Sequence, residues 1–327
     1  MKLVVQIPAL DEEATVADVI ARIPRDIEGI SSVTVLVIDD GSSDRTGELA
    51  REAGAMVIRN DQPQGVGAAF RTGIQRSTEL GADAIVTIDA DGQFNPEDMR
   101  MLLKPILSGT SDFVTASRFA NRDLAPKMPW IKKWGNNFMA RLISAMAGRR
   151  YHDVSCGFRA YSRNAYLRLV LTGNFTYTHE VFLTLAYAGL SIREVPLKVQ
   201  GVREHGTSRI APGVIRYGLR TGAIILRTYR DYKPLRFFAF LSILLGGAAL
   251  CFFAFLMYTR ITTGAFTPHK WAGFVAATFG GSALIVFLVG IVAEMLDRSR
   301  ITQEETLYRV RKLEIAMQEI RKMRSPE

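Results

Sequence analysis

The stretch AIVTIDADGQFNPED, Ala84–Asp98, joins a run of apolar residues to two aspartates that are separated by a single residue. Ala84–Ile88 has the composition of a buried strand. Side chains alternate along a strand, so Asp89 and Asp91 share a face if the extended geometry continues. Two such carboxylates repel each other unless a cation lies between them. Mg²⁺ or Mn²⁺ binds carboxylate oxygens and keeps positions for water and phosphate. A solvated Asp-Gly turn is the alternative interpretation.

The chain up to Thr110 alternates short β-rich runs with stretches of helical spacing. The predicted strands are Leu3–Ile7, Val33–Ile38, Met56–Arg59 and Ala84–Ile88, and the predicted helices are Glu12–Ile23, Thr46–Ala53 and Val66–Leu80. This alternation predicts an α/β domain whose sheet is mostly parallel, and such sheets bind ligands at the carboxyl ends of their strands. Polar clusters follow three of these strands, at Pro8–Glu12, Asp39–Asp44 and Asp89–Gln93. We therefore expect one common site at that edge.

Two apolar segments predict membrane spans. Phe237–Thr259 and Trp271–Ala293 contain no charged residue, and about 20 apolar helical residues suffice to cross a bilayer. Eight basic residues lie between Arg203 and Arg236 and more follow the second span, whereas the connecting loop holds only Arg260 and Lys270. This asymmetry predicts that the part of the chain before the first span and both termini are cytoplasmic.

The overall composition agrees with a membrane-associated cytoplasmic protein. The net charge of +9 suits an anionic leaflet, and no nucleic-acid-binding motif accompanies it. Lys2–Ile7 is too short for a secretory apolar region and is predicted to be the first strand. Cys156 and Cys251 are far apart in the chain, and the second lies in a predicted span. We therefore expect no disulfide and no signal peptide.

The predicted organisation has four parts: an α/β domain (residues 1–209), a basic amphipathic juxtamembrane segment (210–236), a two-helix transmembrane hairpin (237–296) and a C-terminal amphipathic helix (297–327). The last part repeats apolar residues at coiled-coil-like spacing, namely Leu307, Val310, Leu313, Met317 and Ile320. This spacing favours a homo-oligomer, although the helix could instead lie on its own domain. Arg122–Gly148 mixes tryptophan and lysine beside apolar residues, which is typical of a segment at the membrane interface or of an ordinary surface helix.

Six motifs occur in the order found in family 2 glycosyltransferases. They are VVQIPALDEEATV, VLVIDDGSSDRT, DADGQFNPED, SRF, DVSCGFRAYSR and REVPLKVQGVREHGTSR. More narrowly, the chain resembles the polyprenyl-phosphate glycosyltransferases similar to dolichyl-phosphate-mannose synthase. The resemblance covers about Leu3–Arg209 and implies a GT-A fold, a nucleotide-sugar donor, a Mg²⁺ or Mn²⁺ cofactor and inversion at the sugar carbon.

The resemblance also implies the residues of a donor site. The expected contacts to base, ribose and diphosphate are Pro8, Ala9, Leu10, Glu12, Asp39, Asp40, Gly65, Asp89, Arg203, Ser208 and Arg209. The expected metal site is Asp89, Asp91 and Gln93. Asp91 is the preferred direct ligand, and Asp89 either binds the metal through water or holds the ribose. A UDP-sugar is favoured as donor, and GDP-mannose is an alternative.

The expected acceptor is a polyprenyl phosphate. Its phosphate is already anionic at pH 7, so it needs cations that orient it more than a general base. The expected acceptor contacts are Arg118, Lys132, Lys133, Ser155, Gly157 and Arg159, and the expected catalytic residues are Asp91, Arg118 and Glu180. Solvated surface charge is the alternative for the two lysines, and Cys156 is interpreted as a small packing residue.

Two rival functions remain at this stage. One is transfer to another lipid or to a glycan, although the QxxRW motif usual in processive synthases of the family is absent. The other is a membrane scaffold built on a degenerate nucleotide-sugar fold. The intact aspartates and Arg118 favour an enzyme.

Overall fold

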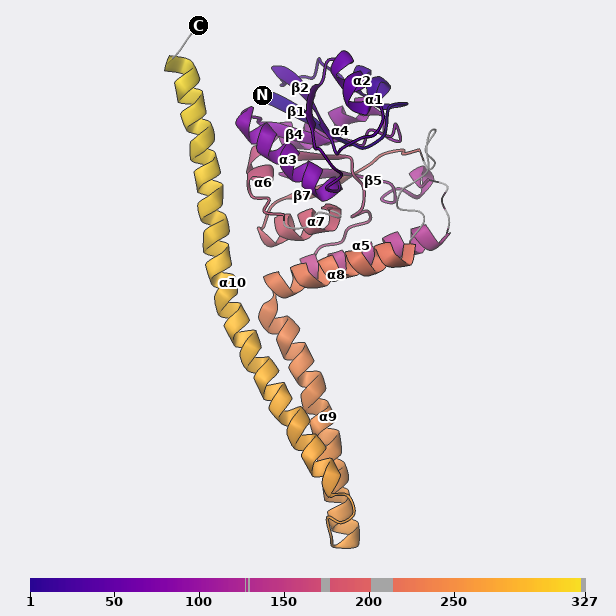
Figure 1. Cartoon of the computed structure of the whole chain (residues 1–327), viewed down its shortest axis with the longest axis vertical. Helices are drawn as coiled ribbons and strands as arrows, with labels where there is room; N and C mark the ends of the chain where they lie inside the picture. The colour runs from indigo at the N-terminus through magenta and orange to yellow at the C-terminus, as the bar shows by residue number, and fades with distance from the viewer. Residues whose placement is uncertain (127, 129, 172–176, 201–213, 325–327) are drawn as a thin grey trace. The chain divides into compact units, whose positions relative to one another are not determined.

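A seven-stranded sheet organises the catalytic part of the chain in the computed structural model (Figure 1). The structure describes residues 1–126, 128, 130–171, 177–200 and 214–324. The chain forms two compact units, one made of Met1–Ile225 with Glu305–Glu327 and the other of Leu226–Glu304.

The order of the strands in the sheet is β3-β2-β1-β4-β6-β5-β7. Their bounds are Lys2–Ala9 (β1), Ser32–Asp39 (β2), Met56–Arg59 (β3), Ala84–Thr87 (β4), Phe113–Ser117 (β5), Arg159–Ser162 (β6) and Ile192–Pro196 (β7). All neighbouring strands are parallel except β6, which runs antiparallel to both β4 and β5. The predicted mostly parallel α/β sheet is confirmed. The antiparallel strand was not predicted.

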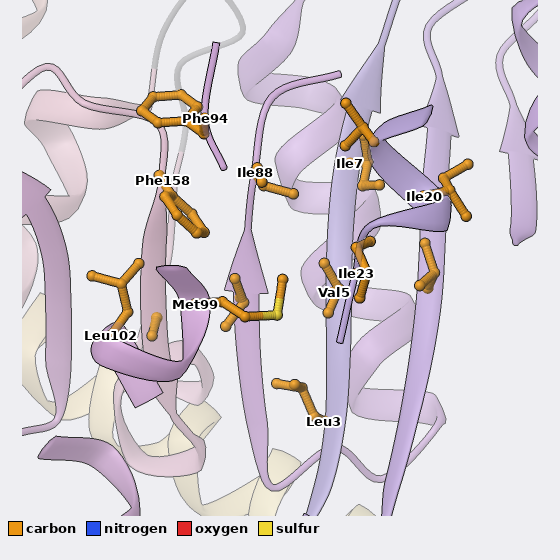
Figure 2. Close-up of a cluster of buried hydrophobic side chains, with 14 of the residues drawn as sticks. Leu3, Val5, Ile7, Ile20, Ile23, Ile88, Phe94, Met99, Leu102 and Phe158 are labelled. Atoms are coloured by element: carbon orange, nitrogen blue, oxygen red, sulfur yellow. The ribbon is translucent and has the colours of Figure 1, made fainter. Parts of the chain in front are cut away.

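Helices cover both faces of the sheet. In the first unit they are α1 (Val16–Ala21), α2 (Thr46–Glu52), α3 (Val66–Glu79), α4 (Met99–Leu107), α5 (Trp130–Ala147), α6 (Arg163–Leu167) and α7 (Thr178–Tyr187), with short 3₁₀ turns at Pro96–Asp98 and Arg122–Leu124. Leu3, Val5 and Ile7 of β1 pack in one buried cluster with residues of α1 and α4 (Figure 2). Val4 points the other way, into a cluster with residues of α3, α5 and α7. This alternation is the period-2 pattern of a strand buried on both faces.

Helix α1 is shorter than the predicted Glu12–Ile23. The segment before it forms a turn because its polar groups are used elsewhere. The Glu12 N–H donates to Thr46 Oγ1 (2.8 Å), and Thr15 Oγ1 donates to the Ala90 carbonyl (2.7 Å). These bonds tie the end of β1 to the segments that follow β2 and β4.

The second unit contains a helical hairpin. Helix α9 spans Pro234–Thr263, and α10 begins at Lys270 and continues to Arg324. Both predicted spans fall inside these helices, and each helix is long and apolar enough to cross a membrane. Small residues let the two helices approach closely. Gly290 has no side chain, and a Cβ added there would lie only 2.8 Å from the Phe238 Cβ, too close for a larger residue. Ser242 Oγ also donates to the Ala283 carbonyl (2.8 Å).

The basic juxtamembrane segment is also helical, as α8 (Val214–Tyr232). The predicted C-terminal helix is not a separate element, because α10 runs on from the second apolar segment without a break (Figure 1). Just after the second apolar segment, the Arg300 guanidinium of α10 lies 3.8 Å from the Tyr232 ring centroid of α8. It also pairs with Asp297 (2.6 Å) and Glu304 (2.6 Å) of α10.

Candidate active site

The three predicted polar clusters meet at one edge of the sheet. Strands β2, β1 and β4 are parallel neighbours, so their carboxyl ends lie side by side. The Asp11 N–H donates to Ser42 Oγ (3.0 Å), and the Ser43 N–H donates to Asp11 Oδ1 (2.7 Å). Asp11 has a φ of 42°, a strained value for a residue with a side chain. Strain of this kind is commonly stored at functional sites.

Asp40 holds the loop that leads into α3. Its carboxylate accepts hydrogen bonds from Asn60 Nδ2 (2.8 Å) and from the backbone N–H groups of Gln64 (2.9 Å) and Gly65 (2.8 Å). Gly65 has a φ of 98°, which glycine adopts without the steric penalty of a side chain. These contacts make Asp40 a positioning residue for one wall of the predicted donor pocket.

Asp39 is completely buried at the end of β2. Its Oδ1 accepts the Ser42 N–H (2.8 Å), and its Oδ2 lies 3.6 Å from Arg59 Nε. A Cβ on Gly47 would come within 2.5 Å of Oδ2, so the close approach of α2 depends on that glycine. Asp39 therefore has a fixed orientation at the strand end.

The other predicted donor residues lie at the same edge but differ in exposure. Pro8 and Ala9 pair with Ile38 and Asp39 in the parallel register. The Ala9 side chain lies in the buried core, so it can offer only backbone to a ligand. Leu10 and Glu12 are partly exposed in the turn after β1. Arg203, Ser208 and Arg209 lie outside the described residues.

Asp89 and Asp91 follow β4 at the centre of this edge. Asp91 is 4% exposed, and its Oδ1 accepts the Gln93 N–H (3.1 Å). Gln93 Nε2 donates to the Gln200 carbonyl (3.3 Å), which links this turn to the segment after β7. In the described part of the chain, no three His, Cys, Asp or Glu side chains group closely enough to hold a metal ion. Two hard oxygen ligands fit Mg²⁺ or Mn²⁺ if phosphate and water fill the other positions.

The antiparallel strand β6 brings a second loop to this site. Because β6 runs against its neighbours, its amino end lies beside the carboxyl ends of β4 and β5. Thr87 Oγ1 donates to the Gly157 carbonyl (2.9 Å), and a Cβ on Gly157 would come within 2.7 Å of Asp89 Oδ2. The loop that precedes β6 therefore packs directly against the first aspartate of the DAD sequence.

Arg118, just after β5, is partly exposed and forms an ion pair with the completely buried Asp153 of this loop. Arg118 Nε lies 2.6 Å from Asp153 Oδ2, and Nη2 lies 2.9 Å from Oδ1 and 2.7 Å from Ser155 Oγ. Burial alone would lower the pKa of Arg118, but the adjacent Asp153 carboxylate raises it above its usual value. Burial likewise opposes ionisation of Asp153, yet Arg118 holds the pKa of that carboxyl below its usual value. Both groups are therefore charged at pH 7.

The Asp153 loop is held in turn by Glu194 of β7. The Glu194 carboxylate accepts the backbone N–H groups of His152 (2.9 Å) and Asp153 (2.8 Å), and its Oε2 lies 2.9 Å from His152 Nδ1. Glu194 lies in the motif REVPLKVQGVREHGTSR, and no role was predicted for it. The geometry makes Glu194 a positioning residue that acts on Arg118 through Asp153.

Arg159 differs from the expectation that it contacts the acceptor. Its side chain is completely buried, and the guanidinium donates to the carbonyls of Cys156 (2.7 Å), Thr178 (3.0 Å) and Val154 (3.0 Å). Such an arrangement leaves no surface for a ligand. Arg159 therefore stabilises the loop before β6 and the start of α7.

His179 and Glu180 begin α7 and are both buried. Burial, with a further contribution from Arg159, lowers the pKa of His179 to about 4, so this imidazole is neutral at pH 7. Glu180 is 8% exposed, and its functional role remains a prediction. Cys156 is 1% exposed, and burial raises the pKa of its thiol to about 12, which agrees with its interpretation as a packing residue.

Helix α5 carries Lys132 and Lys133 near its start. Lys133 is exposed, and the Lys132 side chain lies outside the described part of the structure. Asn136 of the same helix accepts a hydrogen bond from Ser155 Oγ, so α5 closes the side of the site that holds Arg118. No sequence pattern pointed to Asn136.

A family model for "Glycosyl transferase family 2" matches residues 4–169, which is about half of the chain and contains every aspartate of this edge. The chain belongs to glycosyl transferase family 2. The fold of this glycosyltransferase agrees with that membership. It is similar to the crystal structure of glucosyl-3-phosphoglycerate synthase from Mycobacterium tuberculosis in complex with Mn²⁺ and UDP-glucose. The TM-score is 0.54 and the identity 24%, over 69% of this chain and 78% of that one.

Two curated relatives have names that describe transfer to a lipid phosphate. The dolichyl-phosphate hexose transferase of Haloferax volcanii is 34% identical over 60% of this chain and 81% of its own length. The undecaprenyl-phosphate 4-deoxy-4-formamido-L-arabinose transferase of Pseudomonas paraeruginosa is 27% identical over 90% of this chain and 84% of its own.

Replacement of Asp40 tests the role of the loop before α3. Asp40→Asn puts an amide N–H where the carboxylate accepts backbone N–H groups, and a hydrogen bond to a charged group is worth about 1.5–3 kcal/mol. We expect the Kd for a nucleotide donor, measured by isothermal titration calorimetry, to rise about tenfold or more. Asp61→Asn changes an exposed aspartate of the same loop and should leave the Kd unchanged. Equal nucleotide affinity of the Asp40→Asn and Asp61→Asn variants would contradict the assignment of Asp40 as a positioning residue of the donor pocket.

Replacement of Glu194 tests the connection to Arg118. Glu194→Gln offers an amide N–H to backbone N–H groups, so the Asp153 loop should loosen. We expect the KM for the acceptor to rise severalfold while the donor affinity stays the same, as measured by steady-state transfer and by titration. The exposed Glu52→Gln is the matched control. A parallel loss of donor affinity would show that Glu194 supports the fold generally.

Proposed function

We propose that this glycosyltransferase transfers a hexose from a nucleotide sugar to polyprenyl phosphate, with inversion, at the cytoplasmic leaflet of the cell membrane. The observation that carries the proposal is the placement of Arg118. This cation is fixed by the completely buried Asp153 carboxylate, and the loop that carries Asp153 also packs against Asp89, at the edge where the donor is expected. The names of relatives that act on dolichyl and undecaprenyl phosphate support the same acceptor class.

Arg118 leaves the Nη1 edge of its guanidinium for a ligand. Its Nε and Nη2 bind Asp153 and Ser155, whereas no contact to a described residue uses Nη1. The side chain is 21% exposed. A charged arginine N–H group forms strong hydrogen bonds with phosphate oxygens. The pair with Asp153 would thus orient Arg118 toward an acceptor phosphate, with Lys132 and Lys133 of α5 as further candidates for that anion.

The chemistry then needs little from a general base. A phosphate oxygen of the acceptor attacks the anomeric carbon, the bond from that carbon to the donor diphosphate breaks, and the nucleoside diphosphate leaves with the bonding electrons. A single displacement of this kind inverts the anomeric centre. The attacking oxygen carries no proton to remove, so this step needs no general base. We assign Glu180 to orienting the sugar or the loop.

Asp89, Asp91 and Gln93 would hold Mg²⁺ or Mn²⁺ together with the donor phosphates. When bound, the ion would neutralise charge that develops on the leaving diphosphate. The protein's own contribution is the fixed geometry of the turn, in which Asp91 accepts the Gln93 N–H and Gln93 is tied to Gln200. Asp39, Asp40 and the loop at Gly65 would bind the nucleoside, and we favour a UDP-sugar over GDP-mannose.

The hairpin and α5 support the proposed membrane placement. Helices α9 and α10 are long enough to span a bilayer, and the basic flanks favour cytoplasmic termini. Trp130, Trp134 and Phe138 project from α5 and are 76%, 61% and 52% exposed. Exposed aromatic side chains beside Lys133 suit the headgroup region of a membrane, where a polyprenyl phosphate presents its phosphate.

A transfer assay tests the proposal. Purified full-length protein is given radiolabelled UDP-glucose, UDP-N-acetylglucosamine, UDP-galactose or GDP-mannose with undecaprenyl phosphate, in Mn²⁺ or in EDTA. We expect one donor to label the lipid, and EDTA to abolish the product. Asp91→Ala should abolish transfer, whereas the exposed Asp26→Ala should retain it. If folded protein binds a nucleotide but labels no lipid from any donor, the acceptor assignment is wrong.

A further inference from the structure

The end of α10 packs against the catalytic unit through one face only. Arg311 Nη1 donates to the carbonyls of Leu167 (2.8 Å) and Leu169 (3.1 Å), at the end of α6. Ile315 is 2% exposed and belongs to the buried cluster on that side of the sheet. These contacts fix the rotation of the helix about its own axis.

An ion pair and a ring contact strengthen this packing. Arg168 of the catalytic unit lies 3.1 Å from Glu305 Oε2, and its guanidinium lies 4.0 Å from the centroid of the Tyr308 ring. A cation over an aromatic ring is attracted by the negative face of that ring. The face defined by Tyr308, Arg311 and Ile315 is therefore occupied within a single chain.

The opposite face of the same segment carries an exposed apolar stripe. Its members and exposures are Val310 (44%), Leu313 (62%), Met317 (54%) and Ile320 (47%). At 3.6 residues per turn, this stripe points about 170° away from the packed face. The 3-4-3 spacing is that of alternating a and d positions in a coiled coil. The catalytic unit cannot bury this stripe, because the helix packs on that unit through its opposite face.

We propose that this stripe pairs with the same stripe of a second copy of the chain, as a short parallel coiled coil. Charge complementarity supports a second copy as the partner. With Val310 at an a position, Arg309 falls at g and Glu314 at the following e. In a parallel pair, g of one helix faces the next e of the other. Arg309 pairs with Glu305 of its own helix (3.1 Å) but is 74% exposed, and Glu314 is exposed too. Each dimer thus gains two further contacts, Arg309–Glu314, by symmetry.

Membrane anchoring explains why the two helices would run parallel and why so short a coiled coil could suffice. Helix α10 runs unbroken from its apolar segment to Arg324, so two copies in one bilayer extend their tails in the same direction. Two heptads are weak in solution, but confinement to a membrane raises the effective concentration of the partner. The inference rests on the proposed membrane anchoring and is independent of the transfer chemistry.

Disulfide trapping in native membranes tests the pairing. In a Cys251→Ala background, Leu313→Cys places a thiol at a d position, whereas Lys312→Cys places one beside it, outside the stripe; the native Cys156 is buried. We expect mild oxidation to produce covalent dimers from Leu313→Cys in at least several-fold higher yield than from Lys312→Cys. Equal yields from the two variants would overturn the proposal. An antiparallel pair would also overturn it, and would be indicated if crosslinks form only between a Leu313→Cys chain and a differently tagged Met317→Cys chain.

Charge exchange tests the register and the choice of partner. Arg309→Glu or Glu314→Arg alone places like charges opposite each other, so each should lower the crosslinking yield in the Leu313→Cys background. Co-expressed with different tags, the two variants should pair with each other in excess of random association, because each supplies the charge that the other lacks. Random association would contradict the proposed register. Since the readout is a crosslink, failure here leaves the glycosyl-transfer proposal untouched, and failure of transfer leaves this one untouched.

Discussion

The ion pair between the partly exposed Arg118 and the buried Asp153 is the interaction on which the acceptor side of the site depends. Removing one partner of such a pair leaves an uncompensated buried charge, which costs about 3–5 kcal/mol. The pair is also part of a longer chain of contacts. The Glu194 carboxylate accepts the Asp153 N–H, and the Asp153 carboxylate in turn accepts the Arg118 Nε–H. The same loop touches Asp89 at Gly157. One loop therefore sets the relative positions of the expected acceptor cation and the expected metal ligand.

The strand β6 makes this arrangement possible. A parallel strand at that place would deliver its amino end to the far edge of the sheet. Because β6 is antiparallel, the loop before it reaches the edge where β4 and β5 end. Donor and acceptor groups can then be positioned by a single loop, which suits a direct displacement between two phosphate-bearing substrates.

The sequence predicted the first four strands and the meeting of the three polar clusters, because short β-rich apolar runs and their alternation with helices follow from local composition. It did not predict the direction of β6, which depends on pairing with distant strands. It assigned Arg159 to the acceptor, although burial directs that guanidinium to backbone carbonyls. Asp40 illustrates an intermediate case: its place beside the donor was predicted, but its hydrogen bonds to the Gln64 and Gly65 N–H groups became apparent only from the structure. A sequence motif does not indicate whether a carboxylate contacts a ligand or the protein's own backbone.

The measurement that tests the account most directly compares donor and acceptor binding in Arg118→Lys, which keeps a charge beside Asp153 but loses the planar fork. We predict unchanged nucleotide affinity and thermal stability close to that of the unaltered protein, with a KM for polyprenyl phosphate raised at least about tenfold, as expected for a lost charged hydrogen bond. An unchanged acceptor KM, or a loss of nucleotide affinity as large as the loss of acceptor binding, would contradict the assignment of Arg118 to the acceptor phosphate.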